Sequence, residues 1–478
     1  MNSDAAELII LDAPSELAAA VEPRFSMPGL AGGAFGWWTR LRADPARMAA
    51  VRVSARALAG SRVLVWSAAL ATIAAFGFGP VRTAFNPPGV TRGFGWLGDL
   101  LAAPAARWDS AWYLVIAHYG YRPDLGALTT SRTAFFPLYP LGVRAISWVG
   151  TPPIVAGVAL SSIALALALY GIHRLATLEL GACGRPHAGF ADPAQAARLA
   201  VMLTAFAPMA FYLSAVYSES LYLALSVGVF WSARNGRWAW VGILGALAAA
   251  TRNTGVVLLL PAVLIYAYGP REGRPVDFMR SGRARLLPRY RLRADALWLA
   301  LVPLGIAAYC AFLGFSGGDP LTPLHAQGAW GRHFAGPYLG VWDGAKAAFE
   351  GARQLLSFQR HHVYFPAAGG SSFVSAGHNL MLFAFLLAAI PALLGVLRRL
   401  PIAYGAYVLA ALAMPLSYPV SYQPLMSLPR FLVVLFPLSI WLGAWLTRHP
   451  RAQRPALLLS ALLMMFFAAQ FATWHWVA

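Results

Sequence analysis

Charged residues are scarce in this sequence, and acidic ones most of all. Only 12% of the 478 residues are charged, and 18 Asp and Glu stand against 37 Lys and Arg. A soluble domain has about 25% charged residues, so an ordinary soluble protein is excluded. The chain has just two cysteines, Cys183 and Cys310. Their wide separation argues against a disulfide framework and against a thiolate metal site.

Motifs of several common enzyme classes are also missing. The chain has no P-loop, no glycine-rich dinucleotide signature and no Gly-x-Ser-x-Gly element, which argues against an ATP-driven pump. No Asp-x-Asp pair lies near Asp109, so metal-dependent sugar-nucleotide chemistry lacks its usual ligand. The His361-His362 doublet has no carboxylate or cysteine at metal-ligand spacing. We expect no metal and no other cofactor, although a divalent cation stays compatible with the sequence.

Long apolar segments are what the chain does contain. Hydrophobic residues make up 59% of it, and runs of about 20 apolar residues recur, each long enough to cross a bilayer core of roughly 30 Å. The pattern predicts an all-α polytopic membrane protein with about eleven transmembrane helices. We expect these spans at 62–80, 153–173, 197–214, 219–233, 238–253, 254–269, 295–314, 377–397, 401–417, 430–447 and 455–475.

The beginning of the chain lacks this apolar pattern. Residues 1–61 mix acidic, basic, Pro and Gly residues without a sustained apolar period. No basic segment followed by an apolar one opens the chain, so the stretch does not form a signal peptide. We expect a disordered cytoplasmic tail over 1–61 and one transmembrane domain over 62–478.

The basic residues set the orientation in the membrane. With the N-terminus in the cytoplasm, the dense arginine run 271–293 and most other basic residues fall inside, as the positive-inside rule requires. The net charge of +19 then needs no nucleic-acid partner, and the chain reads as a multi-pass plasma-membrane protein. Two large loops, about 81–152 and 315–376, lie outside. We expect interfacial helices with aromatic or apolar faces in them, over 108–119, 135–149 and 341–358.

Because acids are few, the outward-facing ones can be considered one by one. They are Asp99, Asp109, Asp124, Glu219, Asp319, Asp343 and Glu350. Asp109 lies between Trp108 and Trp112, which would desolvate its carboxylate and raise its basicity towards an acceptor hydroxyl. The alternative is a helix cap or a partner for Arg107. Glu219, at the outer end of a span, is a second functional candidate, with a helix N-terminal acid as the alternative.

Two arginines lie at the outer ends of predicted spans. Arg252 falls where two spans turn, and Arg430 begins a span beside the polar stretch 417–423. A guanidinium binds phosphate oxygens in bidentate fashion, so either side chain could hold a phosphate group. The alternative for each is snorkelling to lipid headgroups.

Six short motifs follow one another along the chain. They are Arg107-Trp108-Asp109, Gly120-Tyr121, Ala134-Phe135-Phe136-Pro137-Leu138-Tyr139-Pro140, Tyr217-Ser218-Glu219-Ser220-Leu221, Ala250-Thr251-Arg252-Asn253-Thr254-Gly255 and Pro429-Arg430-Phe431. This ordered set resembles the PIG-V-type mannosyltransferases, which are polytopic glycosyltransferases of the GT-C class. The resemblance covers about 62–450, and it implies a GT-C-like fold.

The resemblance also implies an activity. It implies transfer of a hexose, typically mannose, from a polyprenyl-phosphate donor at the extracytoplasmic face. Asp109 would be the catalytic general base of an inverting displacement, Glu219 a second catalytic acid, and Arg252 and Arg430 the donor phosphate-binding residues. Substrate-binding side chains are expected among the motif residues and their neighbours, namely Arg107, Trp108, Trp112, Tyr113, Tyr121 and Tyr139.

The acceptor does not follow from the resemblance. Eukaryotic members act on a glycolipid anchor precursor, whereas an Arg-rich composition with Lys346 as sole lysine is typical of a high-GC bacterium. The expected partners are therefore the donor, membrane lipids, and a lipid, glycan or protein hydroxyl in the cell envelope. A lipid-linked-sugar flippase or transporter and a non-catalytic assembly subunit are the alternatives. An enzyme requires that Asp109, Glu219, Arg252 and Arg430 line one outward-facing cavity.

Overall fold

The structure is a computed structural model that describes residues 43–80, 85–121, 132–181, 192–271, 288–316, 318–364 and 371–477. The chain divides into two compact units, Met1–Met48 and Ala49–Ala478. The described residues of the first unit begin helix α2 (Pro45–Phe76). Residues 1–42, most of the predicted tail, lie outside the described residues. The helices and the site discussed below belong to the second unit.

Helices account for nearly all regular structure. The described ranges contain no β-strand, only two isolated bridges, and the all-α expectation is confirmed. Every predicted span falls on a helix or on two consecutive helices. In chain order these are α2, α7 (Pro153–Gly181), α8 (Pro193–Ala205) with η4 (Ala210–Leu213), α9 (Glu219–Arg234), α10 (Trp238–Thr251), η5 (Asn253–Leu258) with α11 (Leu259–Tyr268), η7 (Ala294–Ala300) with α12 (Leu301–Phe315), α15 (Ser372–Arg399), α16 (Ile402–Leu416), α17 (Leu428–Val433) with α18 (Phe436–Thr447), and α19 (Pro450–Ala472).

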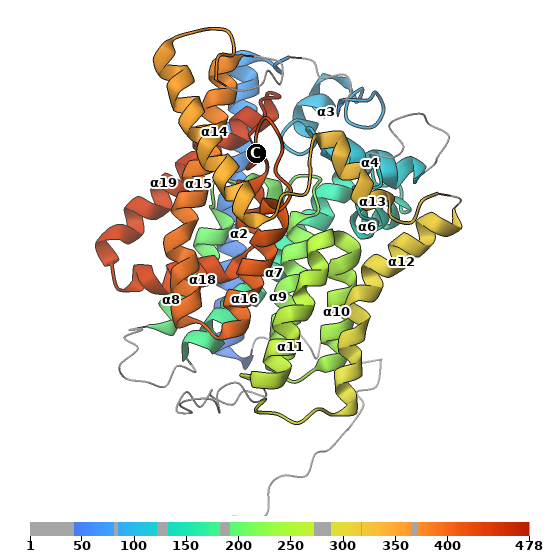
Figure 1. The fold of residues 1–478 in the computed structure, drawn as a ribbon, viewed down its shortest axis with the longest axis vertical. Helices are drawn as coiled ribbons and strands as arrows, with labels where there is room; N and C mark the ends of the chain where they lie inside the picture. Colours follow the sequence, from blue (N-terminus) through green and yellow to red (C-terminus); the bar gives the residue numbers. More distant parts are fainter. Residues whose placement is uncertain are drawn as a thin grey trace, which may run out of the picture. The chain divides into compact units, whose positions relative to one another are not determined.

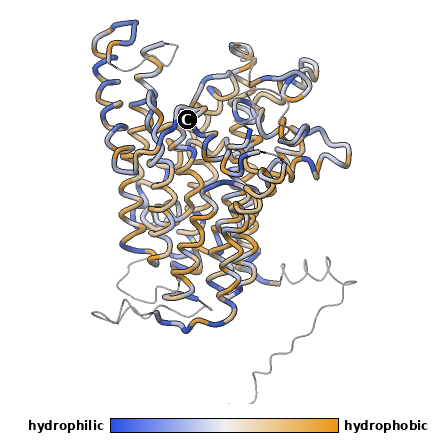
Figure 2. Tube along the Cα trace, turned by 45° about the vertical axis from the view of Figure 1, so that its right-hand side comes forward, coloured by the Kyte–Doolittle hydropathy of each residue, from blue (hydrophilic) through white to orange (hydrophobic). Residues whose placement is uncertain are grey.

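Many of these helices suit a bilayer. Among the described residues, α2, α7, the η7–α12 pair, α15 and α19 are long and apolar enough to cross a membrane, and α10, the η5–α11 pair, α16 and α18 are shorter apolar helices. Figure 2 shows hydrophobic residues along the helices of the second unit and hydrophilic residues towards its two ends. The multi-pass architecture is confirmed, whereas the full number of spans stays a prediction.

Helix α2 begins earlier than predicted. Its first residue is Pro45, so the predicted span 62–80 begins too late, and residues 45–61 of the predicted tail form more than four turns of helix. The residues that α2 buries at its start are small ones spaced four apart, Ala50, Ser54 and Ala57. Small residues let helix backbones approach closely, but they add little hydropathy. The apolar runs therefore do not reveal this part of the helix.

Glycines bring the helices of the bundle close together. A Cβ added to Gly242 on α10 would lie 2.1 Å from the carbonyl oxygen of Trp298, and one added to Gly305 on α12 would lie 2.0 Å from that of Ala246. Helices α10 and α12 are thus in backbone contact, as is common where small residues meet in membrane proteins.

The two large segments predicted to be external, 81–152 and 315–376, both contain helices and are called the external segments below. The first carries α3 (Gly95–Ala102), α4 (Ser110–Tyr119) and α6 (Leu138–Ser147), and the second carries α13 (Thr322–His325), η8 (Ala326–Trp330) and α14 (Pro337–Ser357). Figure 1 shows α3, α4, α13 and α14 together in the upper part of the view, beyond the long helices. The helices expected over 108–119, 135–149 and 341–358 are therefore present as α4, α6 and α14.

Helix α4 differs from the expected interfacial helix in its position. It packs against α6 and α7, and Leu114 is fully buried. Only one side, with Val115 and Tyr119, reaches the surface. The reason is that the α4 residues outside the predicted aromatic face are mostly apolar as well. A helix that is apolar on all sides is buried.

Candidate active site

Asp109 stands at the start of α4, directly after a residue with an unusual backbone. Trp108 has a φ of +54°, a conformation that is uncommon for a bulky residue and costs energy. Asp109 occupies the N-cap position of α4, yet its side chain makes no capping hydrogen bond. An N-cap Asp normally accepts from a backbone N–H of the first turn. The helix-cap interpretation of Asp109 is therefore wrong, because its carboxylate points elsewhere.

Tyr217 holds the backbone around Asp109. Its hydroxyl accepts a hydrogen bond from the Asp109 N–H at 3.1 Å and donates one to the Arg107 carbonyl at 3.0 Å. The phenol is buried, with 1% of its surface exposed. One hydroxyl thus satisfies both backbone groups that flank Trp108, and it fixes the direction in which the Asp109 side chain leaves the chain.

The Asp109 carboxylate meets Arg430. Arg430 lies on α17, which follows Ser427, another residue with positive φ, at +70°. Its Nη1 donates to Asp109 Oδ2 at 2.9 Å. Asp109 and Arg430 are both largely buried, with side-chain exposures of 11% and 12%. A charge-assisted bond in such a partly dry place is strong, so the pair orients both groups.

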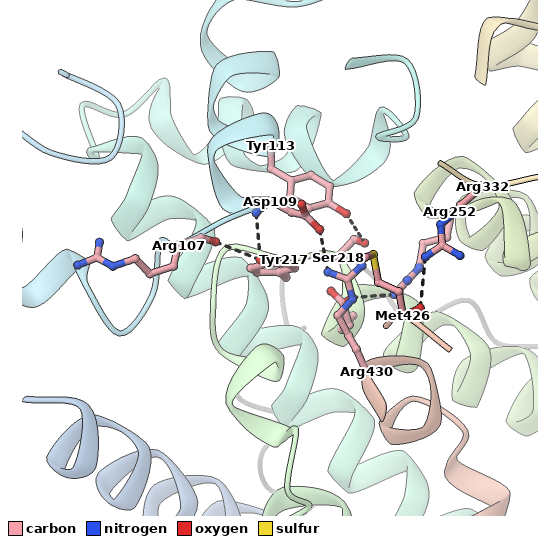
Figure 3. Close-up of polar contacts among 10 residues, drawn as sticks. Arg107, Asp109, Tyr113, Tyr217, Ser218, Arg252, Arg332, Met426 and Arg430 are labelled. Carbon is pink, nitrogen blue, oxygen red and sulfur yellow. Dashed lines mark hydrogen bonds and ion pairs between the residues drawn. The ribbon is translucent and has the colours of Figure 1, made fainter. Parts of the chain in front are cut away.

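Glu219 extends this contact into a chain of alternating charges. Its Oε1 lies 3.3 Å from Arg430 Nε and accepts a hydrogen bond from Arg252 Nη1 at 3.0 Å. The order is therefore Asp109, Arg430, Glu219, Arg252, although the four residues come from α4, α17, α9 and the end of α10. Figure 3 shows Asp109, Arg430 and Arg252 converging from different elements. The structure brings together the four residues that sequence reasoning singled out.

A cavity of about 290 Å³ opens beside these charges. Asp109, Arg252 and Arg430 line it. Glu219 does not, because it lies behind the two arginines with only 1% of its surface exposed. The rest of the wall is mostly apolar and comes mainly from the external segments, from α9, η5, α12, α16 and α17, and from the residues that follow α17 and α19. It includes Phe135, Trp330, Ile306, Met414, Phe431 and Leu435.

Tyr113 also lines the cavity, one helical turn after Asp109. Its hydroxyl shares a hydrogen bond with Ser218 Oγ at 2.9 Å. Burial, together with the nearby Glu219 carboxylate, raises the pKa of Tyr113 to about 12. The phenol therefore stays protonated at neutral pH, and it can donate a hydrogen bond to a bound group but cannot act as the base.

A third arginine reaches the cavity, and the sequence analysis missed it. Arg332 lies in the second external segment and lines the same cavity as Arg252 and Arg430. Its Nη1 donates to the Tyr418 carbonyl at 3.0 Å and its Nη2 to the Met426 carbonyl at 3.3 Å. The signal that identified the other two arginines, a basic residue on the predicted outer side, was also present for Arg332. Arg332 was passed over because it adjoins no predicted span.

Arg107 and Trp108 do not reach the cavity, contrary to their predicted substrate-binding role. Arg107 Nε donates to the Ala472 carbonyl at 3.0 Å, and its guanidinium lies 4.6 Å from the Trp474 ring centroid. Figure 3 shows Arg107 extending away from Asp109, so Arg107 is not its ion-pair partner. Trp108 packs edge-on against Trp474 and Trp476. Both residues tie the start of α4 to the segment after α19.

Three other predicted substrate-binding residues support the site from behind. Trp112 stacks on Phe135 with ring centroids 5.7 Å apart. The Tyr121 hydroxyl donates to the Phe135 carbonyl, and the Tyr139 hydroxyl donates to the Gly157 carbonyl at 3.1 Å. None of the three lines the cavity. The hydroxyls of Tyr121 and Tyr139 are already bonded to backbone, and the ring of Trp112 packs on Phe135, so these residues support the wall of the cavity. Their substrate-binding role stays a prediction.

The structure also differs from the predicted desolvation of Asp109 by its two neighbouring tryptophans. Trp108 and Trp112 both turn away from the cavity and pack against other aromatic rings. Trp476, from the segment after α19, lines the cavity with Asp109, as does Trp330. The apolar neighbours exist, but they come from distant parts of the chain, which no local pattern could reveal.

Metal ligands do not cluster in the part of the chain that the structure describes. No three His, Cys, Asp or Glu side chains come together in the described ranges, and Asp109 and Glu219 are separated by Arg430. The expectation that the chemistry needs no metal stays a prediction.

Comparison with known proteins supports the resemblance. Residues 56–264 match the family model Mannosyltransferase (PIG-V), so the predicted resemblance is confirmed over that stretch, which contains Asp109, Glu219 and Arg252. The chain is 30% identical over 186 residues to GPI alpha-1,6-mannosyltransferase 2 of Rattus norvegicus, covering 36% of this chain and 34% of the relative. It is 28% identical over 229 residues to the Homo sapiens protein of that name, covering 45% and 41%.

The chain thus spans between a third and a half of the length of these curated relatives. Among solved structures it is similar to the oligosaccharyltransferase of Archaeoglobus fulgidus tethered to an acceptor peptide. That similarity has a TM-score of 0.38 and 14% identity, and it covers 86% of this chain and 55% of the other.

Proposed function

We propose that this chain is an integral-membrane glycosyltransferase of the GT-C class. It transfers a hexose, mannose in the first place, from a polyprenyl-phosphate donor to a hydroxyl on a lipid, glycan or protein. The observation that carries the proposal is the Asp109–Arg430–Glu219–Arg252 chain at one side of a cavity whose other walls are apolar. The mannosyltransferase family model over 56–264 supports the choice of sugar transfer.

The side of the membrane follows from charge. The dense arginine run 271–293 belongs in the cytoplasm, which leaves α4, α6 and α14 on the other side. The site then faces the extracytoplasmic side of the plasma membrane, and the N-terminus is cytoplasmic.

Asp109 serves as the general base. Its Oδ2 is paired with Arg430, and it lines the cavity, so its other carboxylate oxygen can accept the proton of the acceptor hydroxyl. The acceptor oxygen forms a bond to the anomeric carbon as the bond from that carbon to the phosphate oxygen breaks. The bonding electron pair leaves with the phosphate. A single displacement of this kind inverts the anomeric configuration.

The cavity has separate regions for the two ends of the donor. The phosphate belongs beside the arginines, where fixed positive charge stabilises a leaving group that becomes more negative. The polyprenyl chain belongs along the apolar wall made by residues such as Ile306, Met414 and Leu435, since apolar surface leaves water favourably.

Glu219 acts on the arginines rather than on the substrate. It is buried behind Arg252 and Arg430 and contacts both. We therefore assign it as a positioning residue, which replaces the catalytic role suggested by the resemblance.

The decisive experiment replaces Asp109 by Asn. Purified protein in detergent is given a synthetic polyprenyl-phosphate mannose and a hydroxyl acceptor, and formation of the new glycosidic bond is followed. Positioned general bases contribute about 10²–10⁴-fold to rate, so Asp109→Asn should lower kcat by that factor. Donor binding, measured as thermal stabilisation by the donor, should persist.

The matched control is Asp343→Asn, the same change on α14 at a position that does not line the cavity. It should keep the wild-type rate. Full activity of Asp109→Asn, or equal loss in Asp343→Asn, contradicts the assignment of the base.

The competing function is a flippase or transporter for lipid-linked sugars. Transporter sites lie near the midplane of the bilayer between helices, whereas this site is formed largely by the ends of helices and by the external segments. A flippase would move a labelled donor lipid across liposomes and form no glycosidic bond. That outcome, with no transfer in detergent, would replace the proposal.

A further inference from the structure

The charges at the cavity do not sum to zero. Asp109 and Glu219 carry two negative charges, and Arg252 and Arg430 carry two positive ones, so these four residues balance. Arg332 also lines the cavity. Within the described ranges, no carboxylate lies at ion-pair distance from it. The site therefore holds one positive charge in excess, and Arg332 is its source.

Arg332 is held in one orientation by two backbone carbonyls. These belong to Tyr418 and Met426, at 3.0 and 3.3 Å from the two terminal nitrogens. A guanidinium has five N–H donors, and the two carbonyls use one each. Both Tyr418 and Met426 line the cavity as well, so the remaining donors lie at a wall that an anion can reach.

The loop that carries Arg332 is also held by backbone contacts. Backbone hydrogen bonds join His333 to the Pro419 carbonyl at 3.4 Å and Ala335 to the Ser417 carbonyl at 2.9 Å. Arg332 itself is bridged to Val420 through backbone. These backbone contacts dock the loop alongside the two hydrogen bonds of the Arg332 side chain, so the side chain is not its sole attachment.

The electrostatic surroundings of Arg332 favour an anion. Burial and the nearby Arg430 guanidinium lower the pKa of Arg332 to about 10. The group is still charged at neutral pH, but its charge is poorly compensated by the protein. A ligand with one negative charge would supply the missing compensation.

We infer that Arg332 is the residue that anchors the phosphate of the donor, and that it sets the requirement for a phosphate-bearing lipid. This inference rests on the proposed function. A sugar-phosphate-polyprenyl diester carries one negative charge, which brings the total at the site to zero. Arg252 and Arg430 were predicted to hold this phosphate, but each already pairs with a carboxylate.

The experiment compares Arg332→Gln and Arg332→Lys with the wild type. Two probes are used, a synthetic short-chain polyprenyl phosphate and the matching polyprenol without phosphate. Binding is measured as thermal stabilisation, and inhibition is measured in the transfer assay. Hydrogen bonds to charged groups correspond to about 10- to 100-fold in affinity. Arg332→Gln should therefore weaken polyprenyl phosphate and raise the donor KM by that factor, while polyprenol binding changes less than about twofold.

The lysine variant and a control position sharpen the result. Arg332→Lys keeps the charge but loses the fork geometry, so it should recover part of the phosphate affinity. Arg353→Gln, on α14 and away from the cavity wall, should behave as wild type. A variant that loses phosphate and polyprenol binding together, or one that loses neither, overturns the inference.

The binding arm separates this inference from the proposed function. If the wild type forms no glycosidic bond, the proposed function fails. Selective loss of polyprenyl phosphate binding in Arg332→Gln would still establish the anion site. If transfer occurs and the donor KM of Arg332→Gln is unchanged, the proposed function stands and Arg332 is not the anchor.

Discussion

Replacing Glu219 by Gln tests whether the chain of charges holds the site together. Glu219 is 1% exposed, and a single oxygen, Oε1, faces both Arg252 and Arg430 at 3.0 and 3.3 Å. The amide keeps the size of the side chain and one acceptor oxygen, but it removes the negative charge. The four residues would then carry one excess positive charge in a largely dry place, and Arg332 would add another.

The expected cost can be worked out from these distances. At an effective dielectric constant of about 20, each of the two ion pairs is worth roughly 5 kcal/mol of Coulomb energy. Much of this is offset, because the carboxylate no longer has to be desolvated. Removing one partner of a buried pair costs about 3–5 kcal/mol in measured cases. The retained amide oxygen places Glu219→Gln at the lower end, about 3 kcal/mol.

The assay is the apparent unfolding temperature of the purified protein in detergent. A loss of about 3 kcal/mol corresponds to a decrease of about 3 °C in a chain of this size, because the entropy of unfolding grows with the number of residues. Glu219→Gln should also lower kcat, because Arg430 no longer holds the Asp109 carboxylate in a fixed direction.

Two further variants make the test specific. Glu350→Gln breaks an exposed pair with Lys346 at 4.0 Å, and such pairs contribute about 0–1 kcal/mol, so its unfolding temperature should barely change. In Glu219→Gln combined with Arg252→Gln, the charges balance again, and the double variant should be more stable than the sum of the single effects. Additive single effects, or an unchanged unfolding temperature for Glu219→Gln, would refute the account.

Two predictions concern the tyrosines at the site. Tyr217→Phe leaves the Asp109 N–H and the Arg107 carbonyl without their shared partner. It should cost about 1–3 kcal/mol in stability and change kcat more than KM. An unchanged kcat would show that the two hydrogen bonds of the Tyr217 hydroxyl are not needed for catalysis. Tyr113→Phe should lower the rate by less than about tenfold and leave the pH profile unchanged below pH 10, because the pKa of Tyr113 is raised to about 12 and the phenol is protonated throughout that range. A pH profile displaced by this variant would contradict the assignment of Asp109 as the base.

The helices were predictable because apolar length is a direct physical requirement of a membrane span. Each predicted span overlaps helix in the structure, although 197–214 is split between α8 and the short η4. The start of α2 was missed for an equally direct reason. Its contact face is built from Ala50, Ser54 and Ala57. These small residues pack closely but contribute little hydropathy, so they do not look like part of an apolar span.

The charged residues were predictable because a charge beside a span is costly. Only a few acids and arginines occur there, and Asp109, Glu219, Arg252 and Arg430 do meet in the structure. Arg332 lies in a loop, where an arginine costs little, and so this argument cannot find it. Its importance emerges only when the charges around one cavity are added together.

The neighbours of Asp109 were predicted poorly because adjacency along the chain does not decide where a side chain points. Trp108 adopts a positive φ, and this turns its ring and Arg107 towards the segment after α19 while Asp109 faces the cavity. A single backbone dihedral thus separates residues that are consecutive in sequence. No periodicity argument contains that information.

The aromatic rings around the cavity have a consequence for how a substrate can enter. Trp112 and Phe135 belong to the first external segment and Trp330 to the second, and their centroids lie 5.7 to 6.4 Å apart. Three such contacts are worth roughly 1.5–4.5 kcal/mol if they add. These ring contacts therefore join the two segments, which are distant in sequence, beside the cavity. A substrate that entered between the two segments would have to separate these rings at that cost.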